Sequence, residues 1–173
     1  GAGIGFGGGC LPKDIRAFIA RAGEIGTSQA LAFLVEVDAV NLRRRERVAE
    51  IAREMMGGVV AGKRVAVLGA AFKPNSDDVR DSPALTIAGQ LHLQGAFVTV
   101  HDPKAMDNAR RRFPTLTYAE SAIAACRDAD VVLHLTEWPE FREIDPKLLG
   151  TVVASKNVVD GRNLLDRDLW RAA

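Results

Sequence analysis

The sequence has few cysteines and no long apolar run. Only Cys10 and Cys126 occur in 173 residues, whereas a disulfide framework needs more cysteines in a shorter chain. We therefore expect both thiols to be reduced and the protein to be cytoplasmic. No stretch of about 18 apolar residues is present, so no membrane-spanning helix is predicted, and no basic leader with a cleavage site is visible. The chain opens on a glycine loop without a methionine, and we expect an N-terminal part to be missing from it.

A charge excess and metal-ligand patterns are also lacking. Lys and Arg number 23 and Asp and Glu number 22, which gives a net charge of +1 and argues against a nucleic-acid partner. His92, His101 and His134 stand at no metal-ligand spacing with carboxylates or cysteines, so we expect no metal. Apolar residues make up 47% of the chain, which is enough for a packed core and argues against disorder.

Residues 1–58 are interpreted as a glycine loop followed by two helices. Apolar residues from Ile15 to Ala22 follow the i, i+3, i+4, i+7 spacing of an amphipathic helix. A second helix is predicted over 28–56, because neither proline nor glycine interrupts it, and it would be on the order of 43 Å long. A small domain cannot cover a helix of this length. We therefore expect part of its apolar face to meet another domain or a second subunit.

Residues 63–173 alternate between strand and helix patterns. Buried strands are predicted at 63–69, 96–102, 130–136 and 157–160, with a very short one at 116–117. Helices are predicted between them, from Ser82 and Pro83 to Gly95 and near 104–113, 121–127, 146–149 and 165–171. Strands that alternate with helices pair in parallel through right-handed crossovers. The predicted fold class is therefore α/β, with a helical segment followed by a Rossmann-like doubly wound parallel sheet.

The opening loop and Cys10 form the most informative stretch. Six of the first nine residues are glycine, which lets the backbone approach a ligand closely. The pattern overlaps a dinucleotide fingerprint, but no strand precedes it, so a loop around a phosphate or sugar is favoured. Pro12 fits the first turn of a helix, which predicts Cys10 at a helix N-terminus. The exposed amides there, with Lys13 close by, favour a thiolate, the environment expected of a nucleophile.

Three cations stand where a ligand could be bound. Lys73 lies in the turn after the first strand, at the carboxyl end where open α/β sheets bind ligands. This turn has one glycine, Gly69, and the bulky Phe72 where a pyrophosphate would need bare backbone. Arg80, before a helix, and Arg162, after the last strand, could each clamp a phosphate with the guanidinium fork. From the residues alone, a solvated lysine and surface arginines are favoured.

Other features are interpreted as structural. Cys126 lies among alanines and is predicted to be a packed small side chain. The basic run at 43–47 is predicted to be a solvated helix face. Trp138 and Phe141 could line a pocket, but core packing is the default interpretation.

Five strings now fall in one order, namely GFGGGCLPKD, KRVAVLGAAFKPNSDDVRDSPA, VHDP, LTEWPEF and VVDGRNLLD. Together they resemble the nucleotide-sugar dehydrogenases of the UDP-glucose/GDP-mannose dehydrogenase family, over essentially the whole chain. The resemblance extends only to the central helical region and the C-terminal domain of that family. It implies two parts, residues 1–58 with the active-site loop and dimerisation helices, and residues 63–173 as a Rossmann-like UDP-sugar-binding domain.

The resemblance implies an enzyme that oxidises C6 of the sugar twice with two NAD⁺. Cys10 matches the cysteine that captures the intermediate aldehyde as a thiohemiacetal, which becomes a thioester and is hydrolysed. Asp14 matches the aspartate that orients or activates water, and its i+4 spacing puts it on the same helix face. Lys13 and Arg80 match residues that contact NAD.

The resemblance also implies the substrate contacts and the partner. Phe72, Lys73 and Arg162 match residues that contact the UDP-sugar, and the long helix matches the core of a homodimer. The NAD-binding N-terminal domain has no counterpart here, so we expect this chain alone to be inactive. The loop around the sugar corresponds to Gly1, Ala2, Gly3, Ile4, Gly5, Phe6 and Gly7.

Two alternatives stay open. Family members that oxidise GDP-mannose share the cysteine–lysine–aspartate motif, although FKPNSDDVRDSPA fits the UDP-glucose branch better. A dimerising module that binds a nucleotide sugar without any chemistry is the other alternative. It would carry an unreactive Cys10.

Overall fold

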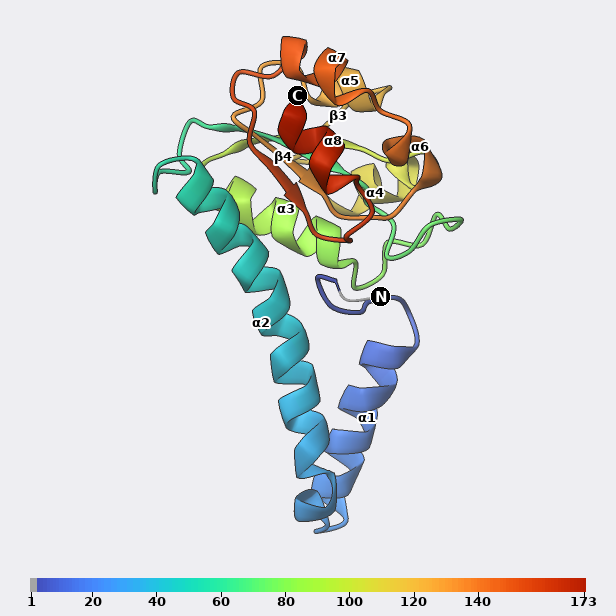
Figure 1. The fold of residues 1–173 in the computed structure, drawn as a ribbon. Coiled ribbons are helices and arrows are strands. Elements are labelled where there is room, and N and C mark those ends of the chain that lie inside the picture. Colours follow the sequence, from blue (N-terminus) through green and yellow to red (C-terminus); the bar gives the residue numbers. More distant parts are fainter. Residues whose placement is uncertain (1–2) are drawn as a thin grey trace.

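The computed structural model describes residues 3–173 and divides them between a helical arm and an α/β head (Figure 1). The arm consists of α1 (Leu11–Glu24), the 3₁₀ turn η1 (Ser28–Leu31) and α2 (Ala32–Met55). Helix α1 runs away from the head and α2 returns to it, so the two lie side by side in opposite directions. Gly1 and Ala2 lie outside the described residues.

The helices of the arm end where the sequence supplies glycine. Gly26, with φ of 72°, follows α1, and Gly57 and Gly58, with φ of 78° and 85°, follow α2. The amide of Gly58 donates to the carbonyl of Arg53 at 2.9 Å, which closes the last turn of α2. The predicted helix over 28–56 is present, but its first turn is the 3₁₀ turn η1 and the α-helix begins only at Ala32.

Five parallel strands form the sheet of the head, in the order β3-β2-β1-β4-β5. This order is that of the first five strands of a doubly wound fold, in which the strand order reverses between β1 and β4. The predicted α/β fold with a long helix and a parallel sheet is confirmed. The strands are β1 (Arg64–Leu68), β2 (Phe97–His101), β3 (Thr117–Tyr118), β4 (Val131–His134) and β5 (Val158–Asp160).

Helices connect the strands, and most begin at a proline or a capping side chain. Ser82 caps α3, because its Oγ accepts a hydrogen bond from the amide of Leu85 at 3.3 Å. Helix α6 was not expected from the sequence. It is a single turn that starts at Pro139, directly after the buried side chain of Trp138. The helices are α3 (Pro83–Leu93), α4 (Met106–Arg112), α5 (Ala122–Ala125), α6 (Pro139–Arg142), α7 (Pro146–Val152) and α8 (Arg167–Ala172).

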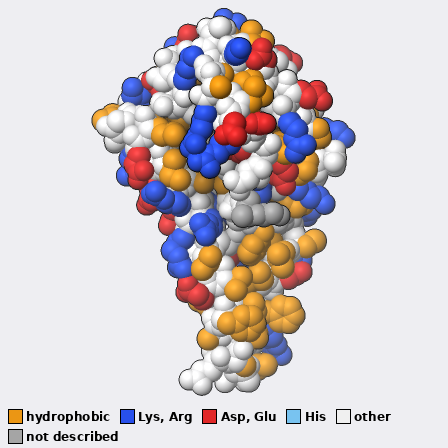
Figure 2. Space-filling view, viewed as in Figure 1, with side chains coloured by type: hydrophobic (Ala, Val, Ile, Leu, Met, Phe, Trp, Pro, Cys, Tyr) orange, Lys and Arg blue, Asp and Glu red, His pale blue; other side chains and the backbone are white. Residues whose placement is uncertain are grey.

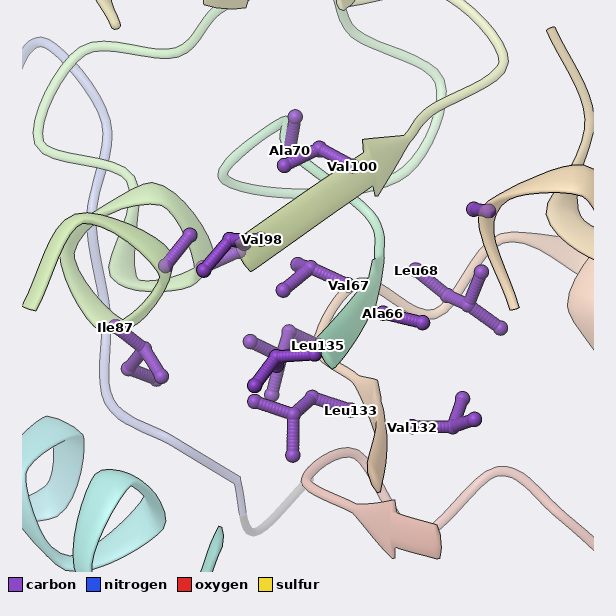
Figure 3. Close-up of a cluster of buried hydrophobic side chains, with 14 of the residues drawn as sticks. Ala66, Val67, Leu68, Ala70, Ile87, Val98, Val100, Val132, Leu133 and Leu135 are labelled. Carbon is purple, nitrogen blue, oxygen red and sulfur yellow. The ribbon is translucent and has the colours of Figure 1, made fainter. Parts of the chain in front are cut away.

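The core lies on both faces of the central strands. In Figure 3, Val67 and Leu133 lie on the side of Ile87 from α3, whereas Leu68 and Val132 lie on the opposite side. Strands covered on both faces have nearly continuous apolar sequences, as β1 and β4 do.

Three expectations about packed residues are confirmed. Cys126 is fully buried, and burial raises the pKa of its thiol to about 12. Trp138 and Phe141 also belong to the core.

Among residues 3–173, no helix has the length and apolar character that a membrane span requires.

A buried carboxylate, Asp102, organises the loops at the carboxyl ends of β1 and β2. Its Oδ2 accepts hydrogen bonds from the amides of Ala70 and Ala71, at 2.7 and 2.9 Å, and from the indole of Trp138 at 3.0 Å. Its Oδ1 accepts from the amides of Lys104 and Ala105 at 2.9 and 2.8 Å. Asp102 is 1% exposed, so each of these donors depends on it rather than on water.

Substitution of Asp102 should therefore destabilise the whole head. We expect Asp102→Ala to lower the free energy of unfolding by roughly 3–5 kcal/mol, because several buried donors lose their acceptor. Asp107→Ala is the control, since that side chain is 84% exposed in its ion pair with Arg110, and it should change stability by less than about 0.5 kcal/mol. Urea unfolding measures both. Equal effects of the two substitutions would contradict the role given to Asp102.

Candidate functional site

The opening loop lies against the head instead of extending into solvent. The side chain of Ile4 is 2% exposed and belongs to the core cluster. A Cβ at Gly161 would lie 2.6 Å from Cγ2 of Ile4, and a Cβ at Gly3 would lie 3.2 Å from Nη1 of Arg162. The loop and the turn after β5 are therefore packed together with no space for larger side chains.

Two side chains of α2 bind the backbone of Phe6. The amide of Phe6 donates to Oδ1 of Asn41 at 2.7 Å, and Nδ2 of Asn41 donates to the carbonyl of Phe6 at 3.0 Å. Nη2 of Arg45 donates to the same carbonyl at 2.8 Å. Asn41 and Arg45 are 3% and 2% exposed. The loop thus receives from α2 the hydrogen bonds that a neighbouring strand would otherwise provide.

The next glycines lie against the turn that precedes α3. A Cβ at Gly7 would lie 2.2 Å from the carbonyl oxygen of Asp81, and a Cβ at Gly8 would lie 2.8 Å from the ring of Phe72. Gly8 also has φ of 95°, and its amide donates to the carbonyl of Arg80 at 2.9 Å. Close approach and a left-handed backbone both require glycine at these positions.

Cys10 follows this anchored segment and is exposed at the N-terminal end of α1. The amide of Asp14 donates to the carbonyl of Cys10 at 2.9 Å, which closes the first turn of the helix. Nζ of Lys13 lies 3.2 Å from Oδ1 of Asp14, with both side chains more than half exposed. Thiol, carboxylate and ammonium are therefore all accessible within one helical turn.

Arg80 is the cation beside Cys10 across the loop. A Cβ at Gly9 would lie 2.3 Å from Cζ of Arg80, so the guanidinium covers this part of the loop. The pKa of Arg80 is raised by its hydrogen bonds to Asp78 and by the charge of Asp78, with a smaller contribution from the negative charge of Cys10. The same ion pair lowers the pKa of Asp78. The expected surface pairing of Arg80 is thus present, and it coincides with proximity to the thiol.

Arg162 lies on the other side of the loop, after β5. Its Nε donates to the carbonyl of Leu135 at 2.8 Å and lies 3.1 Å from Oε2 of Glu137. Burial lowers the pKa of Arg162, and the charge of Glu137 opposes this shift. The arginine is therefore held in a fixed, partly buried place at the carboxyl end of a strand and is not a free surface cation.

Asp160 fixes the turn that carries Arg162. Its carboxylate accepts the amides of Arg162 and Leu165, at 3.0 and 2.9 Å, and lies 2.8 Å from Nδ1 of the buried His134. Burial alone would raise the pKa of Asp160, but the hydrogen bonds with His134 and the two amides outweigh it and hold the pKa at about 2. The carboxylate thus stays charged and the turn stays fixed across the neutral range.

A cavity of about 600 Å³ opens between the loop and α2. It brings together several residues that the family resemblance implicates, namely Gly3, Gly5, Phe6 and Arg162. Ile4 points into the core and is not among its lining residues. The remaining lining residues, all from α2, are Phe33, Glu36, Val37, Val40, Asn41 and Arg44.

Phe72 and Lys73 are separated from this cavity and lie toward Gly8. The ring of Phe72 packs on Gly8, and Nζ of the exposed Lys73 lies 5.4 Å from the centre of that ring. Arg80 borders a separate polar cleft of about 670 Å³ with Asp77, Asp78 and arginines of α4. The implicated residues therefore form two groups on the two sides of the opening loop.

Sequence reasoning missed two functional residues, Asn41 and Arg45. The interpretation of 43–47 as a solvated face holds for Arg43, Arg44 and Arg47, which are exposed, but is wrong for the buried Arg45. A signal was available, because Asn41 and Arg45 stand at i and i+4 and begin a buried face that is purely apolar further on. That face consists of Asn41, Arg45, Val48, Ala49 and Ala52.

The turn after β1 offers no backbone for a dinucleotide. Its amides at Ala70 and Ala71 donate to Asp102, and a Cβ at Gly69 would lie 2.4 Å from Thr136. A pyrophosphate normally receives such amides at this place. The contacts of these amides with Asp102, like the bulk of Phe72, disfavour a pyrophosphate at this turn.

Fold and site together define an α/β protein with a cavity between the opening loop and α2, which Arg162 borders from the carboxyl end of β5. Residues 66–167 match the UDP-binding domain of the UDP-glucose/GDP-mannose dehydrogenase family. The chain belongs to this family.

Relatives and solved structures agree with this assignment. The chain is 42% identical over 167 residues to UDP-glucose 6-dehydrogenase AglM of Haloferax volcanii, which covers 96% of the chain and 37% of the relative. It is 39% identical over 168 residues to UDP-glucose 6-dehydrogenase of Rhizobium meliloti, with 96% and 38% covered. A UDP-glucose dehydrogenase structure from Pyrobaculum islandicum superposes with a TM-score of 0.84 at 38% identity, over 99% of the chain and 37% of that protein. The chain thus spans little more than a third of the length of these relatives.

Proposed function

We propose that this chain supplies the thiol and most of the nucleotide-sugar pocket of an NAD-dependent UDP-glucose 6-dehydrogenase. One observation carries the proposal. A single anchored loop lines the 600 Å³ cavity with its first residues and ends at an exposed cysteine that begins a helix. A sugar nucleotide held along this loop would bring its reacting carbon to the thiol, which converts capture into an intramolecular step.

In the proposed chemistry Cys10 is the nucleophile. The Cys10 sulfur attacks the sugar aldehyde and forms a thiohemiacetal, whose oxidation gives a thioester that water hydrolyses to the uronate. The N-terminal end of α1 and the guanidinium of Arg80 give this end of the loop a positive electrostatic potential. Asp14, which is exposed one turn into the helix, would orient the hydrolytic water.

The proposed UDP-sugar contacts use cations on both sides of the loop. Arg162, fixed by Asp160 and Leu135, presents a guanidinium at the cavity, where a diphosphate would accept its hydrogen bonds. Phe72 and Lys73 would contact the sugar nucleotide from the side of Gly8. Gly1 and Ala2, which the family resemblance assigns to the same loop, lie outside the described residues.

NAD is proposed to bind mainly outside this chain. Lys13 and Arg80 are exposed cations beside Cys10, and their charge fits the pyrophosphate of a dinucleotide that reaches the thiol from outside. NAD would supply the acceptor for the hydride that leaves the sugar carbon. With the β1 turn occupied by Asp102, we propose that the chain alone binds the sugar nucleotide without turning it over.

Isothermal calorimetry tests the substrate. We expect UDP-glucose to bind the chain more tightly than GDP-mannose, and Arg162→Leu to weaken the binding about tenfold or more, because a charged hydrogen bond to phosphate is lost. Arg142→Leu, on the exposed surface of α6, is the matched control. No binding of either nucleotide sugar would contradict the proposal, and a preference for GDP-mannose would assign the chain to the GDP-mannose branch of the family.

The absorbance of NADH tests whether the chain alone turns over its substrate. It should stay constant when NAD⁺ is added with UDP-glucose.

Alkylation separates an enzyme from a module without chemistry. We expect iodoacetamide at pH 7 to label Cys10 at a rate above that of free cysteine and to leave Cys126 unlabelled, since Cys126 is buried with a pKa of about 12. Cys10→Ser should abolish labelling of the folded chain, and peptide mapping locates the label. A Cys10 that reacts like free cysteine would favour the module that binds a nucleotide sugar without any chemistry.

We also propose a cytoplasmic location. Both thiols are free in the structure, in keeping with it.

A homodimer through the arm is the proposed assembly. Apolar side chains gather on the surface of α1 and α2 in the lower part of Figure 2. A single chain leaves these side chains in contact with water, and exposed apolar surface of this kind is typical of a contact with another protein. The exposed large apolar residues of the arm include Phe18 and Ile25 of α1, Phe33, Val37 and Val40 on one side of α2, and Val35 and Leu42 on its other side.

A charge placed on the exposed apolar surface of α2 should separate the subunits. We expect Leu42→Asp to convert a dimer into a monomer in sedimentation, because an unpaired carboxylate would be buried in the interface. Leu93→Asp is the control, since Leu93 is an equally apolar residue, 88% exposed, at the end of α3 and not on either helix of the arm. A monomeric wild-type chain, or a dimer that tolerates Leu42→Asp, would contradict the proposed interface.

A further inference from the structure

Arg45 is a buried arginine that joins three separate segments. Its Nη1 donates to Oδ1 of Asp81 at 2.8 Å and to Oγ1 of Thr86 at 3.2 Å. Its Nη2 donates to the carbonyl of Phe6 at 2.8 Å and approaches that of Asp81 at 3.5 Å. A charge this deeply buried is costly unless it is paired, and both terminal nitrogens of Arg45 are paired while its Nε has no hydrogen-bond partner. The opening loop, the turn before α3 and α3 itself are thereby tied to α2.

Asp81, the partner of Arg45, is itself held in an uncommon conformation. Its φ is 47°, in the left-handed region, which is uncommon for non-glycine residues although aspartate adopts it more readily than most. Nη1 of Arg16, from α1, lies 3.5 Å from Oδ2 of Asp81, and Arg16 also pairs with Asp38 of α2 at 3.1 Å. Both arm helices thus contribute an arginine to one carboxylate at the base of the arm.

The loop that ends at Cys10 is confined by this cluster on both sides of Gly7. Phe6 is bound by Asn41 and Arg45. Gly7 lies against the carbonyl of Asp81, and the amide of Gly8 donates to the carbonyl of Arg80. Cys10 follows two residues later. Its place relative to Arg80 therefore depends on contacts made by residues that do not touch it.

We propose that Arg45, assisted by Asn41, is the positioning residue of this site, holding the loop at 5–9 so that Cys10 lies beside Arg80 at the start of α1. The inference rests on the proposed function, in which Cys10 is the nucleophile. Arginine is required because its planar fork reaches a carboxylate and a carbonyl in different directions at once. Lysine keeps the charge, but its donors share a single nitrogen on a flexible stem and do not reproduce the geometry of the fork.

Amide exchange measured by NMR tests the anchoring directly. In Arg45→Lys we expect the amides of Phe6 and Gly8 to exchange roughly tenfold faster or more, while amides of the core strand β1 keep their rates. Arg43→Lys is the control, an exposed arginine on the same helix that pairs with Glu36. Unchanged exchange at Phe6 and Gly8 in a folded Arg45→Lys chain would overturn the proposal.

A double-mutant cycle separates positioning from general stability. Arg80→Met should slow alkylation of Cys10 several-fold in the wild-type chain, because the thiolate loses a neighbouring cation. In the Arg45→Lys background the same substitution should have no effect, because the released loop no longer holds the thiol at Arg80. A purely structural role of Arg45 would leave the Arg80 effect unchanged, and that result would overturn the proposal.

A second variant and a second readout keep the proposal testable if one experiment fails. If Arg45→Lys fails to fold, Asn41→Ser removes the amide partner of Phe6 without removing a buried charge and should give the same local increase in exchange. If wild-type Cys10 reacts like free cysteine, the proposed nucleophile fails. The exchange rates of Phe6 and Gly8 still decide whether Arg45 anchors the loop.

Discussion

The site depends on an ion pair between the buried Arg45 of α2 and the partly exposed Asp81 of the turn before α3. Arg45 and Asp81 meet at 2.8 Å where the arm joins the head, and the carbonyl of Phe6 shares the same guanidinium. Because a buried guanidinium tolerates few arrangements of its partners, it fixes helix, turn and loop in one geometry. The glycines of the loop make this possible, since a Cβ at Gly7 would collide with the carbonyl of Asp81. Cavity and thiol are therefore placed by the same contact.

A second carboxylate changes what the Rossmann-like fold can bind. In dinucleotide-binding domains the amides after the first strand face a pyrophosphate. Here the amides of Ala70 and Ala71 donate to Asp102, so that a protein carboxylate occupies the place of the ligand anion. The turn becomes a rigid support for Phe72, whose ring covers Gly8. The opening loop thus lies where a dinucleotide would bind in such a domain. This agrees with the UDP-binding domain that this part of the chain matches.

Local signals predicted most of the fold. Ser82 and Pro83 mark the start of α3, and Gly57 and Gly58 mark the end of α2. Short apolar runs between the helical patterns mark the strands. These signals act within a few residues, so the sequence displays them directly. The buried polar residues of α2 were not predicted, because their burial depends on partners far away in the sequence. Arg45 looked solvated because its neighbours Arg43, Arg44 and Arg47 are solvated, and its three partners come from other segments.

The sequence by itself determined the element order, the α/β class, the helix N-terminus at Cys10 and the family to which the chain belongs. Only the tertiary structure decided which polar residues are buried and which cations meet at the site. Arg162 and Arg80 are equally charged in the sequence, yet one is fixed at a cavity and the other lies exposed beside the thiol. The reason is that burial and pairing arise between segments far apart in the chain, where no local pattern records them.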